Sequence, residues 1–310
     1  MSTPTNGKPP VQQDDDSLGM IDDRMSRHFA SLTPAERQLA IHLTRNYPIA
    51  GLSSMTVLAK AAGVSSPTVL RLVQKLGFRG YPEFQTQLHA EVEARLESPI
   101  AKHARWIADA PQTHVLNRFA DAILANLTST LSRIDHAEFD ACADMLADPK
   151  RRIMVTGGRI THALAEYLVG QLGIVRPGVT MLSALSNRWP PALLDLRPGD
   201  VLIVFDIRRY ENTILSLTDT AAEQGAEIVL LTDPWVSPAA GNARFRFSAQ
   251  IEVPSAWDSN VALLVLVEAL LAAVLERTWD DTETRMKRLE SLYDSAGLFR
   301  RGRPADGRPR

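Results

Sequence analysis

The chain has 310 residues, 45% of them apolar and 23% charged, which is enough for roughly two domains with buried cores. Its formal net charge is −2, which excludes a protein that coats nucleic acid or membranes through overall positive charge. The single cysteine excludes a disulfide framework and a cysteine-rich zinc site, and the seven histidines lack the spacing of a metal-binding motif. We therefore expect no metal ion and no cofactor.

The sequence also indicates no membrane attachment. The most apolar stretch, residues 261–275, is about 15 residues long and contains Glu268, whereas a membrane-spanning helix needs roughly 20 apolar residues. The polar and acidic segment of residues 1–19 contains no apolar run typical of a signal peptide. We expect a cytoplasmic protein with no membrane partner.

The first third of the chain shows the pattern of several short helices joined by tight turns. The run TPAE at residues 33–36 is typical of a helix start, because the threonine can cap the helix and the glutamate can reach back to the cap. A second helix is predicted over residues 55–62, and Gly63 suits the left-handed turn that follows it. Ser65 is placed to cap a third helix that ends near Leu76.

The predicted third helix has one apolar and one basic face. Val69 and Val73 recur at the spacing of a single helix face and are expected to pack inward. Thr68, Arg71 and Lys75 are expected to share the opposite, exposed face. A helix, a glycine-containing turn and a second helix with a polar outer face form a helix-turn-helix motif, which places its second helix in the major groove of DNA.

The charge of this segment favours DNA binding over the alternative of an ordinary three-helix bundle with a solvated basic surface. Residues 54–81 contain four basic side chains and no acidic one, although the whole chain is net negative. Such a surface can approach phosphates and release their counterions. Ser66, Thr68 and Arg71 are expected at base edges and the remaining side chains mainly at phosphates. The residues predicted to contact DNA are Lys60, Ser65, Ser66, Thr68, Arg71, Lys75, Arg79 and Tyr81.

From about residue 152 the pattern changes to short, β-branched apolar segments that alternate with helical stretches. This alternation indicates a parallel sheet with helices on both faces. Residues 115–132 and 137–147 have helical spacing and are expected to bridge the two regions. Asp258 or Ser259 is expected to cap the long apolar helix that follows the last strand. The predicted strands are residues 152–156, 179–182, 201–206, 227–233 and 245–253.

Residues 32–90 resemble the N-terminal domain of the RpiR/MurR transcriptional regulators, above all in the stretches LTPAERQLA and SSPTVLRLVQKLGFRGY. The resemblance extends through residue 278. In that family a helix-turn-helix domain precedes a sugar-isomerase-type (SIS) domain that senses a phosphosugar. The resemblance therefore implies an all-α N-terminal domain plus an α/β SIS domain, a doubly wound parallel sheet with flavodoxin-like layers.

Composition and resemblance together divide the chain into six segments. The last of them contains five arginines and almost no apolar residue that could be buried. The predicted segments are a disordered N-terminus (1–19), a helix-turn-helix DNA-binding domain (20–98), a linker with bridging helices (99–148), the SIS effector and oligomerisation domain (149–280), a C-terminal helix (281–299) and an arginine-rich disordered tail (300–310).

In SIS domains two loops at the carboxyl ends of strands form the ligand pocket. The first usually resembles G-x-G-x-S, and the corresponding residues 157–161 read GGRIT here, so that Arg159 replaces a glycine. The second usually reads S-x-S-G-x-T, whereas residues 206–211 read DIRRYE and lack those hydroxyl groups. The resemblance implies that the effector-binding residues are Gly157, Gly158, Arg159, Thr161, Asp206, Arg208 and Arg209.

Two arrangements of the second loop are open at this point. In one, Arg208 and Arg209 turn into the pocket and supply contacts to an anion. In the other, Asp206 pairs with one of these arginines and closes the pocket or builds a subunit contact.

We expect a DNA-binding transcriptional regulator, not an enzyme, whose SIS domain senses a small anionic, phosphosugar-like metabolite. It should bind double-stranded operator DNA as a homodimer or homotetramer, with subunit contacts from the apolar faces of residues 115–147 and 261–275. One alternative is a SIS-type sugar-phosphate isomerase, for which Glu211, His162 and Glu166 are the candidate bases. A second alternative is a domain that only assembles the oligomer and binds no ligand.

Overall fold

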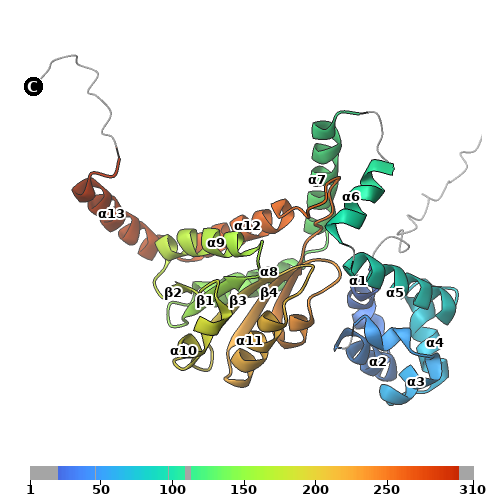
Figure 1. Cartoon of the computed structure of the whole chain (residues 1–310). Coiled ribbons are helices and arrows are strands. Elements are labelled where there is room, and N and C mark those ends of the chain that lie inside the picture. Colours follow the sequence, from blue (N-terminus) through green and yellow to red (C-terminus); the bar gives the residue numbers. More distant parts are fainter. Residues whose placement is uncertain (1–19, 46, 97, 109–112, 300–310) are drawn as a thin grey trace, which may run out of the picture. The chain divides into compact units, whose positions relative to one another are not determined.

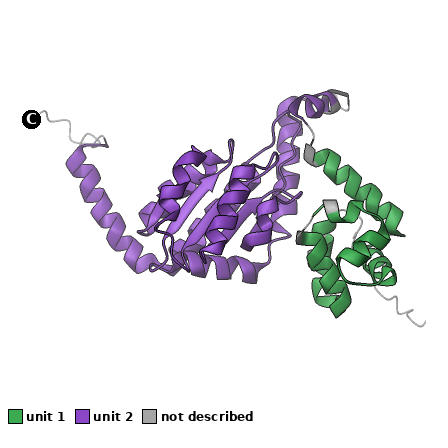
Figure 2. Cartoon of the chain, turned by 60° about the horizontal axis from the view of Figure 1, so that its bottom comes forward, with its two compact units in different colours: residues 1–95 green, residues 96–310 purple. Residues whose placement is uncertain are grey.

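The computed structural model describes residues 20–45, 47–96, 98–108 and 113–299. The chain forms two compact units, residues 1–95 and residues 96–310 (Figure 2). The two terminal segments that the sequence predicts to be disordered lie outside the described residues. Within the described part of the chain, no helix is both long enough and apolar enough to cross a membrane.

Unit 1 is helical throughout its described secondary structure. Apolar side chains from its helices, among them Leu39, Leu58, Leu72 and Phe84, are buried in one common core. The all-α N-terminal domain expected from the sequence is confirmed. Its helices, shown in Figure 1, are α1 (Ile21–His28), α2 (Pro34–Arg45), α3 (Met55–Ala61), α4 (Ser66–Lys75) and α5 (Tyr81–Leu96), with 3-10 turns at Phe29–Ser31 and Ile49–Leu52.

Capping residues set the ends of these helices as the sequence predicts. The backbone N–H of Thr33 donates to Glu36 Oε2 at 2.9 Å, and the Thr33 hydroxyl accepts from the Glu36 N–H at 3.4 Å. Ser65 caps α4 by accepting a hydrogen bond from the N–H of Thr68. Between α3 and α4 the chain turns at Gly63, whose φ of +68° would strain any side chain. α3 and α4 therefore form the helix-turn-helix pair.

Unit 2 contains a five-stranded sheet in which all neighbouring strands are parallel. The strand order β2-β1-β3-β4-β5 means that the winding reverses between β1 and β3. The predicted doubly wound sheet is confirmed, and ligands of such sheets bind at the carboxyl ends of the strands where the winding reverses. The strands are β1 (Ile153–Gly157), β2 (Val179–Met181), β3 (Val201–Asp206), β4 (Glu227–Thr232) and β5 (Ala243–Ser248).

Helices cover both faces of this sheet (Figure 1). On one face, α10 and α11 bury side chains such as Trp189 against Leu202 of the central strand β3. On the other face, α8, α9 and α12 pack on the sheet, and Leu168 and Val267 meet Ile203 there. The helices are α6 (Pro99–Ala108), α7 (Val115–Leu131), α8 (His136–Ala147), α9 (His162–Val175), α10 (Trp189–Leu193), α11 (Asn212–Glu223), α12 (Val261–Arg277) and α13 (Trp279–Ala296).

The last strand is shorter than predicted. It ends at Ser248 instead of residue 253, because β4 ends at Thr232 and leaves no ladder partner beyond that point. The chain beyond β5 bonds to α7 instead, where the N–H of Gln250 donates to the hydroxyl of Thr130 at 2.9 Å. The helix α7, expected to bridge two domains, thus belongs to unit 2.

The apolar run of α12 is used inside unit 2. Leu263, Leu266 and Leu270 are at most 3% exposed, and α12 packs against α8 and α9. These buried side chains are covered within unit 2, so subunit contacts from residues 261–275 stay a prediction for the partly exposed apolar side chains such as Leu264 and Leu271.

Candidate functional site

The first candidate site is the exposed side of α3 and α4. The apolar face of α4, including Val69, is buried as predicted. Arg71 of α4 and Lys60 of α3 are exposed, and Ser65 is exposed at the N-terminal cap of α4. Ser66 is half-buried beside it. The amino end of α4 therefore combines exposed polar side chains with the positive end of a helix dipole, which attracts phosphate.

Thr68 does not share this exposed face, contrary to expectation. It is 4% exposed, and its hydroxyl lies 2.9 Å from that of Ser65. The same oxygen accepts a hydrogen bond from Arg71 Nη2 at 3.2 Å. Residues three positions apart are neighbours on a helix, so Thr68 turns toward the cap on one side and toward Arg71 on the other. Thr68 is therefore placed to orient these two residues and not to touch a base.

Two acidic residues outside the basic segment of residues 54–81 reduce its charge. Lys75 Nζ lies 2.7 Å from Glu36 Oε2, and the Glu36 side chain is 2% exposed. Burial alone would raise the pKa of Glu36, but hydrogen bonds, first of all from Lys75, outweigh it and lower that pKa. Arg79 pairs with Glu83 at 3.1 Å in an exposed position, where ion pairs contribute little. Arg79 can exchange this partner for a phosphate, whereas a buried carboxylate holds Lys75.

Tyr81 is not available for the phosphate contact that the sequence suggests. It is 7% exposed, and its hydroxyl donates to the carbonyl oxygens of Gly51 at 3.1 Å and of Ser53 at 2.8 Å. Burial raises the pKa of Tyr81 to about 12. These hydrogen bonds connect the start of α5 to the turn before α3. The aromatic ring of Tyr81 packs in the core of unit 1.

The second candidate site lies in unit 2, at the carboxyl ends of β1 and β3. A Cβ at Gly157 would lie 2.7 Å from the carbonyl oxygen of Thr161, so only glycine allows the tight turn into α9. A Cβ at Gly158 would lie 3.1 Å from Oε1 of Glu211. The backbone N–H of Arg159 donates to the same oxygen at 2.8 Å. Glu211 thus joins the loop after β3 to the loop after β1.

The side chains of Thr161 and Asp206 both bond to groups within the protein, although both residues line the small hollow between the loops after β1 and β3. The Thr161 hydroxyl donates to the carbonyl oxygen of Phe205 at 2.9 Å, and Thr161 is 2% exposed. Asp206 is equally buried and accepts a hydrogen bond from the hydroxyl of Ser237. Burial raises the pKa of Asp206 to about 7, so this carboxyl group is partly protonated at neutral pH. The Thr161 hydroxyl therefore has an internal partner, and a contact between Thr161 and the effector stays a prediction.

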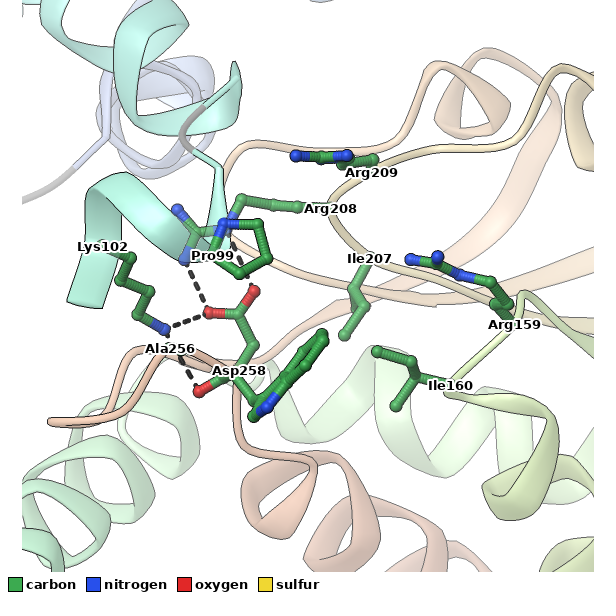
Figure 3. A pocket seen from close by; sticks show the side chains of 10 residues that line it. Pro99, Lys102, Arg159, Ile160, Ile207, Arg208, Arg209, Ala256 and Asp258 are labelled. Atoms are coloured by element: carbon green, nitrogen blue, oxygen red, sulfur yellow. Dashed lines mark hydrogen bonds and ion pairs between the residues drawn. The ribbon is translucent and has the colours of Figure 1, made fainter.

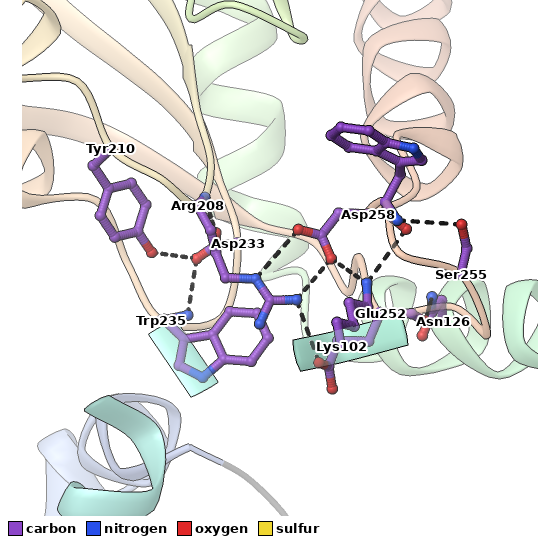
Figure 4. A network of polar contacts seen from close by, with 10 residues as sticks. Lys102, Asn126, Arg208, Tyr210, Asp233, Trp235, Glu252, Ser255 and Asp258 are labelled. Carbon is purple, nitrogen blue, oxygen red and sulfur yellow. Dashed lines mark hydrogen bonds and ion pairs between the residues drawn. The ribbon is translucent and has the colours of Figure 1, made fainter. Parts of the chain in front are cut away.

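Arg208 is engaged in a buried network of charges, which Figure 4 shows. Its Nη2 lies 2.6 Å from Asp258 Oδ1 and 3.3 Å from Glu252 Oε1. Its guanidinium carbon lies 4.0 Å from the centre of the Trp235 ring. Burial alone would lower the pKa of Arg208, but the bonds to these carboxylates outweigh it and raise that pKa. Arg208 therefore pairs with Asp258 and Glu252 and not with Asp206. Its guanidinium is already bonded to these carboxylates, so it does not turn into the pocket as a free binding group for an anion. Both arrangements considered for Arg208 in the second loop are wrong.

The same network includes Lys102 of α6, which sequence reasoning missed. Lys102 Nζ lies 2.5 Å from Asp258 Oδ1, and the Lys102 side chain is 3% exposed. No local pattern marks this lysine, because its partner lies 156 positions away. Of the two residues expected to cap α12, Asp258 bonds to Lys102, while Ser259 Oγ accepts the N–H of Val261 at 3.2 Å from one residue before the N-cap position at Asn260. The sequence offered one signal for this network, the acidic residue Asp258 in the loop after the last strand.

An open pocket of about 140 Å³ lies beside this network (Figure 3). It is smaller than the roughly 300–1,000 Å³ of pockets that enclose drug-sized ligands, so it suits a small metabolite. Ile160 and Ile207 line it, and Trp257 adds an aromatic side chain. Arg159 and Arg209 lie at its rim, exposed, and their guanidinium groups have no polar partner among the described residues. In the described part of the chain, Arg159 and Arg209 are therefore the positively charged side chains of the pocket whose guanidinium groups can bind a ligand.

The candidate bases for an isomerase reaction are not gathered around this pocket. Glu211 lines a smaller, adjoining hollow, and its Oε1 accepts the N–H of Arg159. His162 and Glu166 face each other along α9, with Nε2 and Oε1 3.7 Å apart, and neither lines the pocket in the described part of the chain.

Two known domain families match the chain in the same order as its two units. Residues 20–95 match the helix-turn-helix domain of the rpiR family. Residues 145–273 match the SIS domain. The first match contains α1 to α4 and nearly all of α5, and the second contains the whole parallel sheet.

Individual proteins show the same similarity. The chain is 26% identical over 284 residues to the HTH-type transcriptional regulator HexR of Pseudomonas aeruginosa, covering 87% of this chain and 94% of HexR. The sugar isomerase domain of the RpiR transcription factor from Sphaerobacter thermophilus matches with a TM-score of 0.53 and 25% identity, over 57% of this chain and 97% of that domain. The Vibrio vulnificus NanR protein complexed with ManNAc-6P matches in fold, with a TM-score of 0.51 and 17% identity over 88% of this chain and 98% of NanR.

Proposed function

The chain belongs to the RpiR-type transcriptional regulators, with a helix-turn-helix domain of the rpiR family and a SIS domain, and we propose that it binds operator DNA through α3 and α4 and senses a small anionic metabolite in unit 2. The observation that carries the DNA-binding proposal is the exposed polar face of α4. Arg71 in the middle of α4 and the Ser65 cap at its amino end are exposed, while the apolar face of the same helix is buried. This is the arrangement with which a recognition helix reads base edges.

The DNA-contacting residues divide into two groups in this proposal. Ser65 and Ser66 at the start of α4, and Arg71 in its middle, contact bases or adjacent phosphates, and arginine bonds best to guanine. Lys60 and Arg79 contact phosphates, because both are exposed and neither is held by a buried acid. Thr68, Lys75 and Tyr81 support the interface from within unit 1.

The effector proposal depends on the two arginines at the rim of the pocket. Arg159 and Arg209 come from the loops after β1 and β3, where ligands of doubly wound sheets bind. Their guanidinium groups have no polar partner in the described residues, so an anion would satisfy them at little cost. NanR, which is similar to this chain in fold, was solved in complex with ManNAc-6P, and this supports a small-molecule ligand for this chain.

In this proposal, α6 is the element that couples ligand binding in the pocket to DNA binding. It is the first helix of unit 2 after α5, and Lys102 fixes it to Asp258 at the pocket. Asp258 also holds Arg208, next to Arg209. A ligand that moves the loop containing Asp258 changes how α6 packs on the rest of unit 2. Such a ligand regulates DNA binding only if it binds one position of α6 better than another.

We further propose that the chain acts as a homodimer or homotetramer. A single helix-turn-helix unit buries too little surface for specific binding, and two units read two half-sites about one helical turn apart. The surface that supports this is on α7, where Leu116 and Leu124 are 67% and 62% exposed. Apolar side chains at such exposure are typical of a surface that another subunit covers.

The experiment that tests DNA binding uses a duplex selected by the full chain from a random pool. Fluorescence anisotropy of the labelled duplex should give nanomolar binding that weakens steeply as salt rises. Arg71→Ala should weaken binding by about tenfold or more, and Arg197→Ala, which removes an exposed arginine before β3 in unit 2, should not. Equal affinity of the wild type and Arg71→Ala would refute the proposed interface.

A further inference from the structure

Glu211 fills a position that an anionic ligand takes in many proteins. Its Oε1 accepts the backbone N–H of Arg159, in the loop that leads from β1 into α9. Backbone amides in a loop that precedes a helix are a common site for phosphate and carboxylate groups. Here the chain supplies that carboxylate itself, and a Cβ at Gly158 would meet the same oxygen. A ligand therefore finds this amide already bonded.

The other polar groups around the pocket are also engaged. The hydroxyl of Thr161 bonds to the carbonyl oxygen of Phe205 inside the protein. Lys102 and Arg208 both bond to Asp258, with shortest distances of 2.5 and 2.6 Å. A sugar brings several hydroxyl groups, and each of them loses free energy when it leaves water without gaining a new partner. The pocket offers few partners for such hydroxyl groups.

Cationic and apolar groups remain available. Arg159 and Arg209 have no polar partner among the described residues, and they lie around Ile160 and Ile207 in Figure 3. Trp257 lies on the same pocket and is 61% exposed, which is unusual for so large an aromatic side chain. Two guanidinium groups beside an apolar wall fit a molecule with one acidic end and an apolar body.

On the basis of the proposed function, we propose that the effector is a small apolar carboxylic acid and not a sugar phosphate. Its carboxylate is held between Arg159 and Arg209, and its apolar body lies on Ile160, Ile207 and Trp257. Glu211 excludes a second anionic group from the loop before α9, because two carboxylates or a carboxylate and a phosphate repel each other there.

The test is calorimetric titration and thermal unfolding of the full chain with phenylacetate, glucose 6-phosphate and inorganic phosphate. Phenylacetate should bind and raise the melting temperature, and the two phosphates should do neither at equal concentration. Arg159→Gln and Arg209→Gln should each weaken phenylacetate binding at least tenfold. Arg197→Gln, a matched loss of an exposed arginine at the amino end of β3, should leave it unchanged.

A further variant tests the role of Glu211. Glu211→Thr removes the internal carboxylate and frees the amide of Arg159, so this variant should gain measurable binding of inorganic phosphate. Phosphate binding by the wild type, no binding of phenylacetate, or phenylacetate binding that is unaffected by both arginine variants would overturn the ligand class. Each of these results would leave DNA binding by the ligand-free chain intact, whereas failure of the proposed interface would appear in the anisotropy measurement without ligand.

Discussion

The hydroxyl of Thr68 connects the cap of α4 with the guanidinium of Arg71, although the residue itself is buried. Thr68→Val keeps the shape and removes both hydrogen bonds. We expect operator affinity to fall about fivefold, because Arg71 loses its orientation, and unfolding free energy to fall by about 1 kcal/mol. Anisotropy and thermal unfolding measure the two effects. Thr68→Ser, which keeps the hydroxyl, is the control, and equal affinity of both variants would show that the hydroxyl has no role.

Asp206 should make the stability of unit 2 depend on pH. Its folded pKa of about 7 lies above the ordinary value of 3.8, so its contribution is complete below about pH 4 and is lost as pH rises through 7. Asp233, whose pKa burial raises to about 6, acts in the same direction. The unfolding free energy should fall by up to about 1.4 kcal/mol per pH unit between pH 5 and 7 from Asp206.

The variant Asp206→Asn isolates this contribution. The amide oxygen of asparagine can still accept the hydrogen bond from Ser237, but the side chain no longer titrates. Melting temperatures at pH 5, 6, 7 and 8 should show a smaller slope for Asp206→Asn than for the wild type. Asp195→Asn, at an exposed position, should keep the wild-type slope. Parallel curves for Asp206→Asn and the wild type would contradict the raised pKa.

Single residues were harder to predict from the sequence than the elements that carry them. The helical spacing of Thr68 and Tyr81 gives their angle around a helix, but not which neighbouring groups cover them. Residues 54–81 contain no acidic residue, but Glu36 and Glu83 from outside this segment form ion pairs with its Lys75 and Arg79. Such contacts depend on the tertiary structure, and local sequence patterns do not encode them.

At the scale of elements, α6 should transmit the state of the pocket. Lys102→Met removes the bond from α6 to Asp258, while Asp258 keeps its bond to Arg208. We expect ligand affinity to change less than about threefold and unfolding free energy to fall by about 2 kcal/mol. The ligand should no longer shift operator affinity, because pocket and helix are uncoupled.

Anisotropy with and without ligand measures this coupling. Lys287→Met removes an exposed lysine that pairs with Glu283 on α13, and it should preserve the wild-type response. A full ligand response in Lys102→Met would show that the signal leaves unit 2 by another route.

Elements were predictable where one local signal decides them. Buried parallel strands are continuous apolar runs, so β1, β3 and β4 lie within a residue or two of their predicted positions, as does the partly exposed edge strand β2. Capping residues and Gly63 fixed the ends of α3 and α4. The end of β5 was not predictable in the same way, because it depends on where β4 stops at Thr232.

At the scale of the whole molecule, the chain should form a symmetric dimer or tetramer. Sedimentation should give a mass of two or four times the 34.2 kDa of one chain. Leu124→Asp on α7 should shift the population toward the monomer, because it places a charge on the exposed apolar surface. Leu194→Asp, at another exposed leucine, should not. A wild type that remains monomeric at micromolar concentration would contradict the proposed assembly.

The most direct test of the account is the base preference of the wild type and of Arg71→Ala, measured by selecting duplexes from one random pool with each protein. We predict that the wild type enriches an inverted repeat whose half-sites lie about one helical turn apart. Arg71→Ala should lose the preference at one position in each half-site and keep the preferences at the others. Identical preferences of the two proteins at every position would contradict the assignment of α4 as the helix that reads DNA.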